Sequence, residues 1–188
     1  RMFYSKYIKR ILDVLCAVIL LILLLIPLSC ISVAILINDG RPVIFKQLRT
    51  GQYGKPFYIY KFRTMVKNAE SIGPKHTEAN DTRITKVGAF LRKTSLDELP
   101  QIINILKGDM SFIGFRPGVY HDNVDYNIDK YCLKPGITGY AQVNGRSSLS
   151  IEEVEYWENQ YVKDISVRTD FKIFLGTIKI VLLKKGVN

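Results

Sequence analysis

The feature that most constrains this chain is an uncharged, apolar run over residues 14–38. Its 25 residues are mostly Leu, Ile and Val, and they exceed the length of about 20 apolar residues that a transmembrane helix needs. Pro27 falls near the middle of the run, where its missing N–H and its clash with the carbonyl group of Leu23 interrupt a helix. The sequence therefore predicts a membrane-embedded helix that is broken at Pro27.

Basic residues flank this run on both sides, with Lys6 among those before it and Arg41 among those after it. The positive-inside rule places a basic flank in the cytoplasm, so two such flanks favour a helix that enters the membrane and returns. Each arm of about 13 residues, rising about 1.5 Å per residue, reaches about 20 Å and falls short of a hydrocarbon core of about 30 Å. We predict a re-entrant helix, with a kinked spanning helix as the alternative. Ser29 is expected to donate a hydrogen bond to the carbonyl group of Leu25 at the bend.

The charge balance indicates an anionic partner. The 188 residues include 27 Lys and Arg against 17 Asp and Glu, a formal net charge of +10. Nucleic acid, an acidic membrane surface and a phosphorylated substrate all suit this charge, and composition leaves the three open. The length predicts a single domain over 1–188, with 1–40 as its membrane part and 41–188 facing the cytosol. Three cysteines without a C-x-x-C pair indicate a reducing compartment, with neither a disulfide framework nor a zinc site.

Beyond residue 40 the sequence predicts a small β-hairpin. Residues 42–47 and 56–65 are typical of strands, and a glycine-bearing loop separates them. Period-two alternation places Lys61 on the same strand face as Phe57 and Ile59.

Helices are expected at 86–94, 100–108, 148–162 and 170–185. Gly108 is expected to end the second of them as its C′ residue. The last is apolar with interspersed lysines, so it fits either a core helix or an interfacial helix whose lysines reach lipid headgroups. The predicted fold class is α+β and mainly helical, with a re-entrant helix, a hairpin and amphipathic interfacial helices around a cytoplasmic region.

Two adjacent carboxylates, Asp97 and Glu98, stand out in the basic stretch RKTSLDELPQ. One hypothesis is helix capping: Ser95 and Glu98 match the capping box S-x-x-E, or Asp97 is the N-cap with Pro100 in the first turn. The other is chemistry at phosphorus. Nearby Arg92 favours the ionised form of Asp97, which can then attack an electrophile while Glu98 holds Mg²⁺.

Phosphate chemistry also needs cations and backbone donors. The cationic candidates are Lys61, Arg92, Arg116 and Arg146. Segments 108–118 and 134–146 are rich in glycine, which makes them either ordinary loops or backbone cradles for a nucleotide diphosphate.

Four stretches resemble the bacterial sugar transferase family, and within it the small monotopic phosphoglycosyl transferases. They are KFRTM (61–65), LRKTSLDELPQIINILKGDMSFIGFRP (91–117), KPGITGYAQVNGR (134–146) and RTDFKI (168–173). The resemblance implies transfer of a sugar 1-phosphate from a UDP-sugar to a polyprenyl (undecaprenyl) phosphate, with release of UMP, as the first membrane step of glycoconjugate synthesis. It also implies Mg²⁺, or Mn²⁺ in its place, and the cytoplasmic face of the bacterial inner membrane.

The resemblance assigns roles by position in these motifs. It implies that Asp97 is the nucleophile of a covalent phosphosugar intermediate and that Glu98 is the Mg²⁺ ligand, with Asp97 beside it at the metal. The substrate-binding candidates are Lys61, Arg92, Arg116 and Asp170, to which the glycine-rich segment adds Gln142, Asn144 and Arg146.

Two departures from the family pattern affect the backbone. Ile26-Pro27 stands where the family commonly has Ser-Pro, and Phe115-Arg116-Pro117 replaces a PRP turn, which is expected to loosen the backbone beside Arg116.

Two other hypotheses belong to different classes. A non-enzymatic basic adaptor for anionic lipid or nucleic acid explains the charge and the apolar run, but it leaves the acidic pair without a purpose. A Rossmann-like glycosyltransferase predicts a D-x-D motif and alternating strands and helices, and the sequence has neither. The expected partners are therefore a UDP-sugar, a polyprenyl phosphate and membrane lipids, without nucleic acid.

Overall fold

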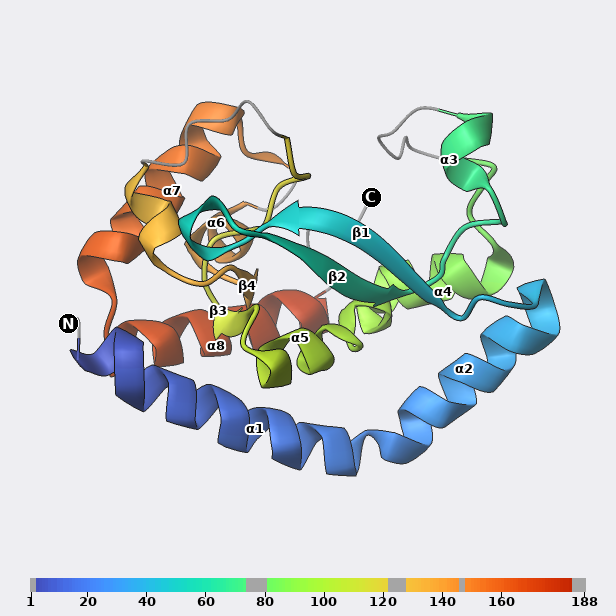
Figure 1. Ribbon diagram of the computed structural model, residues 1–188, viewed down its shortest axis with the longest axis horizontal. Coiled ribbons are helices and arrows are strands. Elements are labelled where there is room, and N and C mark those ends of the chain that lie inside the picture. Colours follow the sequence, from blue (N-terminus) through green and yellow to red (C-terminus); the bar gives the residue numbers. More distant parts are fainter. Residues whose placement is uncertain (1–2, 74–80, 122–127, 146–147, 184–188) are drawn as a thin grey trace.

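The computed structural model describes residues 3–73, 81–121, 128–145 and 148–183. Its N-terminal part is a bent pair of helices, α1 (Lys9–Leu23) and α2 (Leu25–Asp39), preceded by a π-helical turn at Tyr4–Ile8. The pair runs along one edge of the molecule (Figure 1) and is bent by 62°.

The bend lies at Leu24, three residues before Pro27, because the proline acts on the turn that precedes it. Pro27 is the third residue of α2 and has no N–H to offer the carbonyl group of Leu23, where α1 ends. The Ser29 hydroxyl donates to the Leu25 carbonyl oxygen at 2.8 Å, as predicted. Among the described residues no single helix is long and apolar enough to cross a membrane, whereas the bent pair taken together passes by length and composition.

The predicted hairpin is confirmed, with shifted ends. Strands β1 (Ile44–Thr50) and β2 (Pro56–Phe62) pair antiparallel, with Gln47 opposite Ile59 and Arg49 opposite Phe57. Residues that pair directly share a face of the sheet, so this register puts Arg49 on the face that Lys61 occupies.

Two predicted helices follow the hairpin. After the short α3 (Ala69–Ile72) come α4 (Lys86–Thr94) and α5 (Gln101–Lys107), and Gly108 ends α5 at φ 92° as expected. A Cβ on Gly88 would come within 2.0 Å of the Thr64 carbonyl oxygen, so α4 docks directly on the backbone that leaves β2. This close approach sets the position of the chain that follows α4.

The rest of the chain forms two short strands and three α-helices in the described residues. They are β3 (Ser111–Ile113), β4 (Gly136–Thr138), α6 (Tyr140–Asn144), α7 (Ile151–Asp164) and α8 (Val167–Leu183). The parallel pairing of β3 with β4 was not predicted, because both strands lie in segments interpreted only as loops or phosphate cradles. Their glycines serve close packing: a Cβ on Gly136 would lie 2.1 Å from the backbone nitrogen of Gly114.

Gly136→Ala is therefore expected to lower the free energy of unfolding by about 3 kcal/mol, because the added methyl group must push β3 and β4 apart. Gly118→Ala is the matched control, since a Cβ there meets nothing within 4 Å. Thermal or urea denaturation of the two variants measures the difference, and equal midpoints would contradict the packing role of Gly136.

In the part of the chain that the structure describes, the core consists of three hydrophobic clusters between the elements. The hairpin residues Phe57 and Ile59 pack with Ile102 and Ile105 of α5 and with Ala17 of α1. Figure 1 shows α5 between α1 and the hairpin, which agrees with this cluster. A second cluster joins β3, α7 and α8, and a third joins α2, β2 and α4. Both arms of the bent pair are thereby attached to the body that carries the acidic pair.

Candidate active site

The acidic pair lies in a 3₁₀ turn, Leu96–Glu98, between α4 and α5. Both capping predictions are wrong. Ser95 adopts the left-handed conformation (φ 58°) that ends α4, so its side chain does not cap a helix, and the N-cap of α5 is Pro100. The capping box that the structure does show is at the start of α7. Neither capping arrangement predicted for Ser95, Asp97 and Glu98 is therefore present in the described structure.

Glu98 forms an ion pair with Lys61 of β2, with 2.7 Å between Oε1 and Nζ. Lys61 therefore contacts the acidic pair through Glu98, as predicted. Arg92, on the last turn of α4, donates from Nε to the Thr64 hydroxyl at 2.8 Å, and its charge acts on the Asp97 carboxylate. Two predicted cations thus flank the acidic pair from β2 and α4.

The pKa of Asp97 is raised from 3.8 to about 6, first by burial and then by the charge of Glu98, while Lys61 and Arg92 act in the opposite direction. The cations favour the ionised form as predicted, but desolvation outweighs them. A pKa of about 6 leaves the carboxylate mostly ionised at pH 7 and more basic than an ordinary aspartate. Such tuning is typical of reacting groups.

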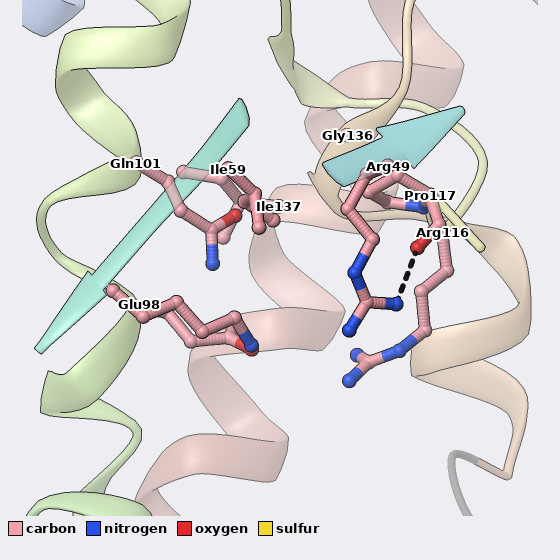
Figure 2. Close-up of a pocket in the computed structure, with 9 residues that line it drawn as sticks. Arg49, Ile59, Glu98, Gln101, Arg116, Pro117, Gly136 and Ile137 are labelled. Atoms are coloured by element: carbon pink, nitrogen blue, oxygen red, sulfur yellow. Dashed lines mark hydrogen bonds and ion pairs between the residues drawn. The ribbon is translucent and has the colours of Figure 1, made fainter. Parts of the chain in front are cut away.

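Glu98 lines a pocket beside this turn. The other lining residues are Arg49, Ile59, Lys61, Gln101, Arg116, Pro117, Gly136 and Ile137. Figure 2 shows Arg49 and Arg116 next to each other on one side, with Glu98 and Gln101 on the other. The structure thus brings together Lys61, Glu98 and Arg116, which the sequence predicted, and Asp97 lies next to them in the turn. Arg92 does not line this pocket.

Arg49 and Gln101 are pocket residues that the sequence interpretation missed. Gln101 lay inside the quoted motif as the start of a helix, without a role. Arg49 could have been found from the hairpin register, which places it on the same face as Lys61.

The backbone at Arg116 is firmly held, contrary to the loosening expected from the FRP sequence. The Arg116 N–H donates to Oε1 of Glu158 at 2.9 Å, and the Phe115 carbonyl oxygen accepts from the Gly136 N–H at 2.9 Å. Glu158 is only 4% exposed and pairs through Oε2 with Lys130 at 2.8 Å. A buried glutamate on α7 therefore positions Arg116.

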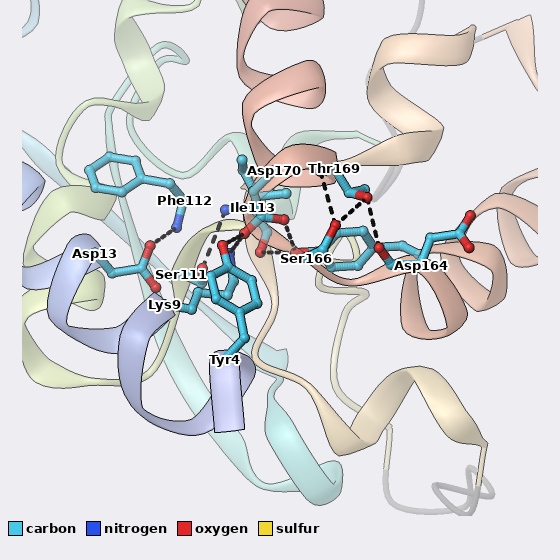
Figure 3. Close-up of polar contacts among 11 residues, drawn as sticks. Tyr4, Lys9, Asp13, Ser111, Phe112, Ile113, Asp164, Ser166, Thr169 and Asp170 are labelled. Atoms are coloured by element: carbon cyan, nitrogen blue, oxygen red, sulfur yellow. Dashed lines mark hydrogen bonds and ion pairs between the residues drawn. The ribbon is translucent and has the colours of Figure 1, made fainter. Parts of the chain in front are cut away.

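Asp170 does not line the pocket. Its carboxylate accepts hydrogen bonds from Lys9 Nζ (2.7 Å), the Tyr4 hydroxyl (2.7 Å) and the Tyr161 hydroxyl (2.6 Å), as Figure 3 shows in part. Nearby, Asp13 of α1 accepts from the N–H of Phe112. Asp170 thus fastens α1 to α7 and α8, outside the pocket that Glu98 lines.

Of the remaining substrate-binding candidates, Gln142 and Asn144 do not line this pocket. Asn144 donates to the carbonyl group of Tyr140 within α6 and is exposed. Gln142 is buried, and neither amide atom has a hydrogen-bond partner in the described structure. Arg146 lies outside the described residues.

The carboxylates of the turn suit a magnesium ion that is shared with substrate. Within the described ranges, no three His, Cys, Asp or Glu side chains gather at one point as a metal cluster. Mg²⁺ commonly takes one or two carboxylates and completes its shell with water and substrate phosphates. The repulsion that raises the pKa of Asp97 is one that a cation would offset. Asp97 and Glu98 therefore fit Mg²⁺.

Comparison with known proteins shows which family this chain is similar to. A family model described as bacterial sugar transferase matches residues 4–184. The undecaprenyl-phosphate galactose phosphotransferase of Salmonella typhimurium is 39% identical, over 97% of this chain and 42% of the relative. The UDP-glucose:undecaprenyl-phosphate glucose-1-phosphate transferase of Escherichia coli is 41% identical, over 93% of this chain and 40% of the relative.

An uncharacterized sugar transferase of Bacillus subtilis, EpsL, is 41% identical, over 96% of this chain and 90% of the relative. The chain therefore spans less than half the length of the Salmonella and Escherichia relatives and most of the Bacillus one.

Proposed function

The chain belongs to the bacterial sugar transferase family, and from this premise we propose that it is a phosphoglycosyl transferase acting on a UDP-sugar and a polyprenyl phosphate. The names of two relatives support this proposal, because they give undecaprenyl phosphate as a substrate and, for one of them, UDP-glucose. The observation that carries it is the pocket itself, where Glu98 faces Lys61 and two arginines beside the half-buried Asp97.

The reaction proceeds in two displacements at one phosphorus atom. An Asp97 carboxylate oxygen attacks the sugar-bearing phosphorus, the bond from that phosphorus to the bridging oxygen breaks, and UMP leaves with that oxygen. An oxygen of the polyprenyl phosphate then attacks the same phosphorus and releases the Asp97 carboxylate. Lys61 and Arg116 offset the negative charge that gathers around the phosphorus.

UMP release from a panel of UDP-sugars tests this proposal. Without acceptor we expect about one UMP per enzyme, and continuous release once undecaprenyl phosphate is added, because the covalent intermediate needs an acceptor to discharge. UMP release that always requires acceptor would contradict the aspartyl intermediate. No UMP from any UDP-sugar would contradict the transferase and favour the adaptor hypothesis.

Metal dependence follows from the acidic pair. Glu98, with Asp97 beside it, would hold Mg²⁺, which when bound neutralises substrate phosphate charge. We expect EDTA to lower turnover by about 100-fold or more, Mg²⁺ to restore it and Mn²⁺ to substitute.

Glu98→Gln should cause a comparable loss, whereas Glu152→Gln, on an exposed glutamate of α7, should change little. Turnover that survives exhaustive chelation would remove Glu98 from this role.

We also propose that α1 and α2 form a re-entrant helix at the cytoplasmic face of the bacterial inner membrane. The polarity of α1 is inverted relative to a water-soluble helix: Lys9 and Asp13 face the protein, while Ile19 and Ile22 are exposed. On α2, Ile26 is 75% exposed. Exposed apolar area of this extent is expected at a lipid surface.

Cysteine labelling tests this topology. In a variant without Cys16, Cys30 and Cys132, single cysteines at Lys6 and Lys55 should both resist an impermeant reagent added from the periplasm. Labelling of one flank only would show a spanning helix instead. Pro27→Leu should straighten the bend and shift the protein towards that spanning form.

A further inference from the structure

Arg49 is a cation at the proposed active site to which neither the sequence motifs nor the proposed chemistry gives a role. It lies near the end of β1, and its pairing with Phe57 puts its side chain on the hairpin face that also carries Ile59 and Lys61. All three of Arg49, Ile59 and Lys61 line the pocket. The hairpin therefore contributes two cations to it, one from each strand.

Two hydrogen bonds hold the Arg49 guanidinium group in place. Nη1 donates to the Pro117 carbonyl oxygen at 3.1 Å, and Nη2 donates to Oε1 of Gln47. Nε is buried and has no partner in the described structure. Burial and, after it, the charge of Arg116 lower the pKa of Arg49. A half-buried guanidinium with a buried, unpaired Nε–H next to a second guanidinium is unfavourable unless an anion joins them.

The neighbouring arginine faces the same space. In Figure 2 the guanidinium groups of Arg49 and Arg116 lie together on the side of the pocket opposite Glu98. Over the described ranges, neither of them forms an ion pair with a carboxylate. The strand that carries Arg49 and the loop that carries Arg116 are also joined, because Thr50 donates its N–H to the Gly118 carbonyl oxygen at 3.0 Å. The two groups are therefore held close together despite their like charge.

We propose that Arg49 and Arg116 form a two-arginine clamp for a substrate phosphate group, with Arg49 as a binding residue that acts directly on the anion. Two guanidinium groups present parallel N–H donors, which match the oxygens of a phosphate better than point charges do. That the anion is a substrate phosphate rests on the proposed function. Both the donor diphosphate and the polyprenyl phosphate carry this chemistry, so the test distinguishes them.

Arg49→Gln tests the clamp, with UMP as the first probe. If the clamp holds the donor phosphate, binding of UMP to the purified protein, measured by calorimetry and by the shift in melting temperature, is expected to weaken at least 10-fold. Lys46→Gln is the matched control, because it removes the same charge from the same strand at an exposed position outside the pocket. It should change UMP binding less than twofold.

Arg49→Lys is a second variant, for use should Arg49→Gln not fold, because it keeps a donor for Pro117 and preserves the fold. It should weaken UMP binding about 3-fold or more because one ammonium cannot bridge two oxygens.

Two kinetic measurements identify which phosphate the clamp holds. If it holds the donor, the half-saturating UDP-sugar concentration for acceptor-free UMP release rises together with the UMP dissociation constant. If it holds the acceptor, UMP binding is unchanged and the half-saturating concentration of undecaprenyl phosphate rises at least 10-fold. A folded Arg49 variant in which all three quantities stay within twofold of the wild type overturns the clamp.

Failure of the clamp and failure of the transferase give different results. Wild-type protein that binds UMP through Arg49 but releases none from any UDP-sugar supports the clamp and contradicts the transferase. Equal turnover of the wild type and Arg49→Gln supports the transferase and contradicts the clamp. Wild-type protein that binds neither UMP nor undecaprenyl phosphate overturns both.

Discussion

Asp97→Asn is expected to abolish turnover and, at the same time, to make the folded protein more stable at neutral pH. Asn keeps the shape of Asp but cannot attack phosphorus to form the intermediate, so UMP release should fall by about 10⁴-fold or more. Glu155→Gln, on an exposed carboxylate of α7, is the control for the loss of one negative charge and should leave turnover unchanged.

The gain in stability follows from the direction of the pKa shift. Burial, and then Glu98, raise the pKa of Asp97 from 3.8 to about 6. Between these two values the unfolded chain releases the proton and the folded protein keeps it, so the stability of the wild type falls as pH rises through this window. Above about pH 6 the ionised Asp97 lowers the free energy of unfolding of the wild type by its full amount, about 1–3 kcal/mol, and Asn removes this destabilisation.

Denaturation of metal-free protein measures this effect, because a bound cation would itself stabilise the ionised form. The variant should be more stable than the wild type at pH 7.5 and equal to it below about pH 4. With Mg²⁺ present, the rate of UMP release by the wild type should fall only at lower pH, because the bound cation favours the ionised form of Asp97. An Asp97→Asn protein with near-normal turnover would contradict the covalent mechanism.

Asp170→Asn is expected to unfold the protein rather than to impair substrate binding. Lys9 and Asp170 are each only 8% exposed, and the carboxylate also accepts from two tyrosine hydroxyls (Figure 3). Removing the anion leaves the Lys9 ammonium buried without its counter-charge, which costs about 3–5 kcal/mol. The melting temperature and the yield of folded protein should both drop.

A double replacement separates this role from a catalytic one. Lys9→Met combined with Asp170→Leu removes both buried charges, so it should be less destabilising than Asp170→Asn alone. If Asp170 bound substrate instead, Asp170→Asn would fold normally and raise the half-saturating substrate concentration. That result would return Asp170 to the active-site role implied by the family resemblance.

The sequence by itself determined the features that depend on neighbouring residues. The uncharged run and Pro27 predicted the bent pair α1 and α2, and the Ser29 hydrogen bond spans only four residues. Helix α4 was predicted to the residue, and Gly108 ended α5 as expected. These signals are local, because periodicity, a missing N–H and a C′ glycine act within one or two turns.

Only the tertiary structure decided how these pieces meet. The register of the hairpin put Arg49 on the same face of the sheet as Lys61, and the pairing of β3 with β4 joined two segments that the sequence interpretation left as loops. Burial, which no local pattern measures, raised the pKa of Asp97 against its neighbouring cations. Asp170 took its place through partners 161 and 166 residues away along the chain. Such contacts depend on which surfaces lose water together when the whole chain folds, and so the buried charges and the pocket could not be predicted from short stretches of sequence.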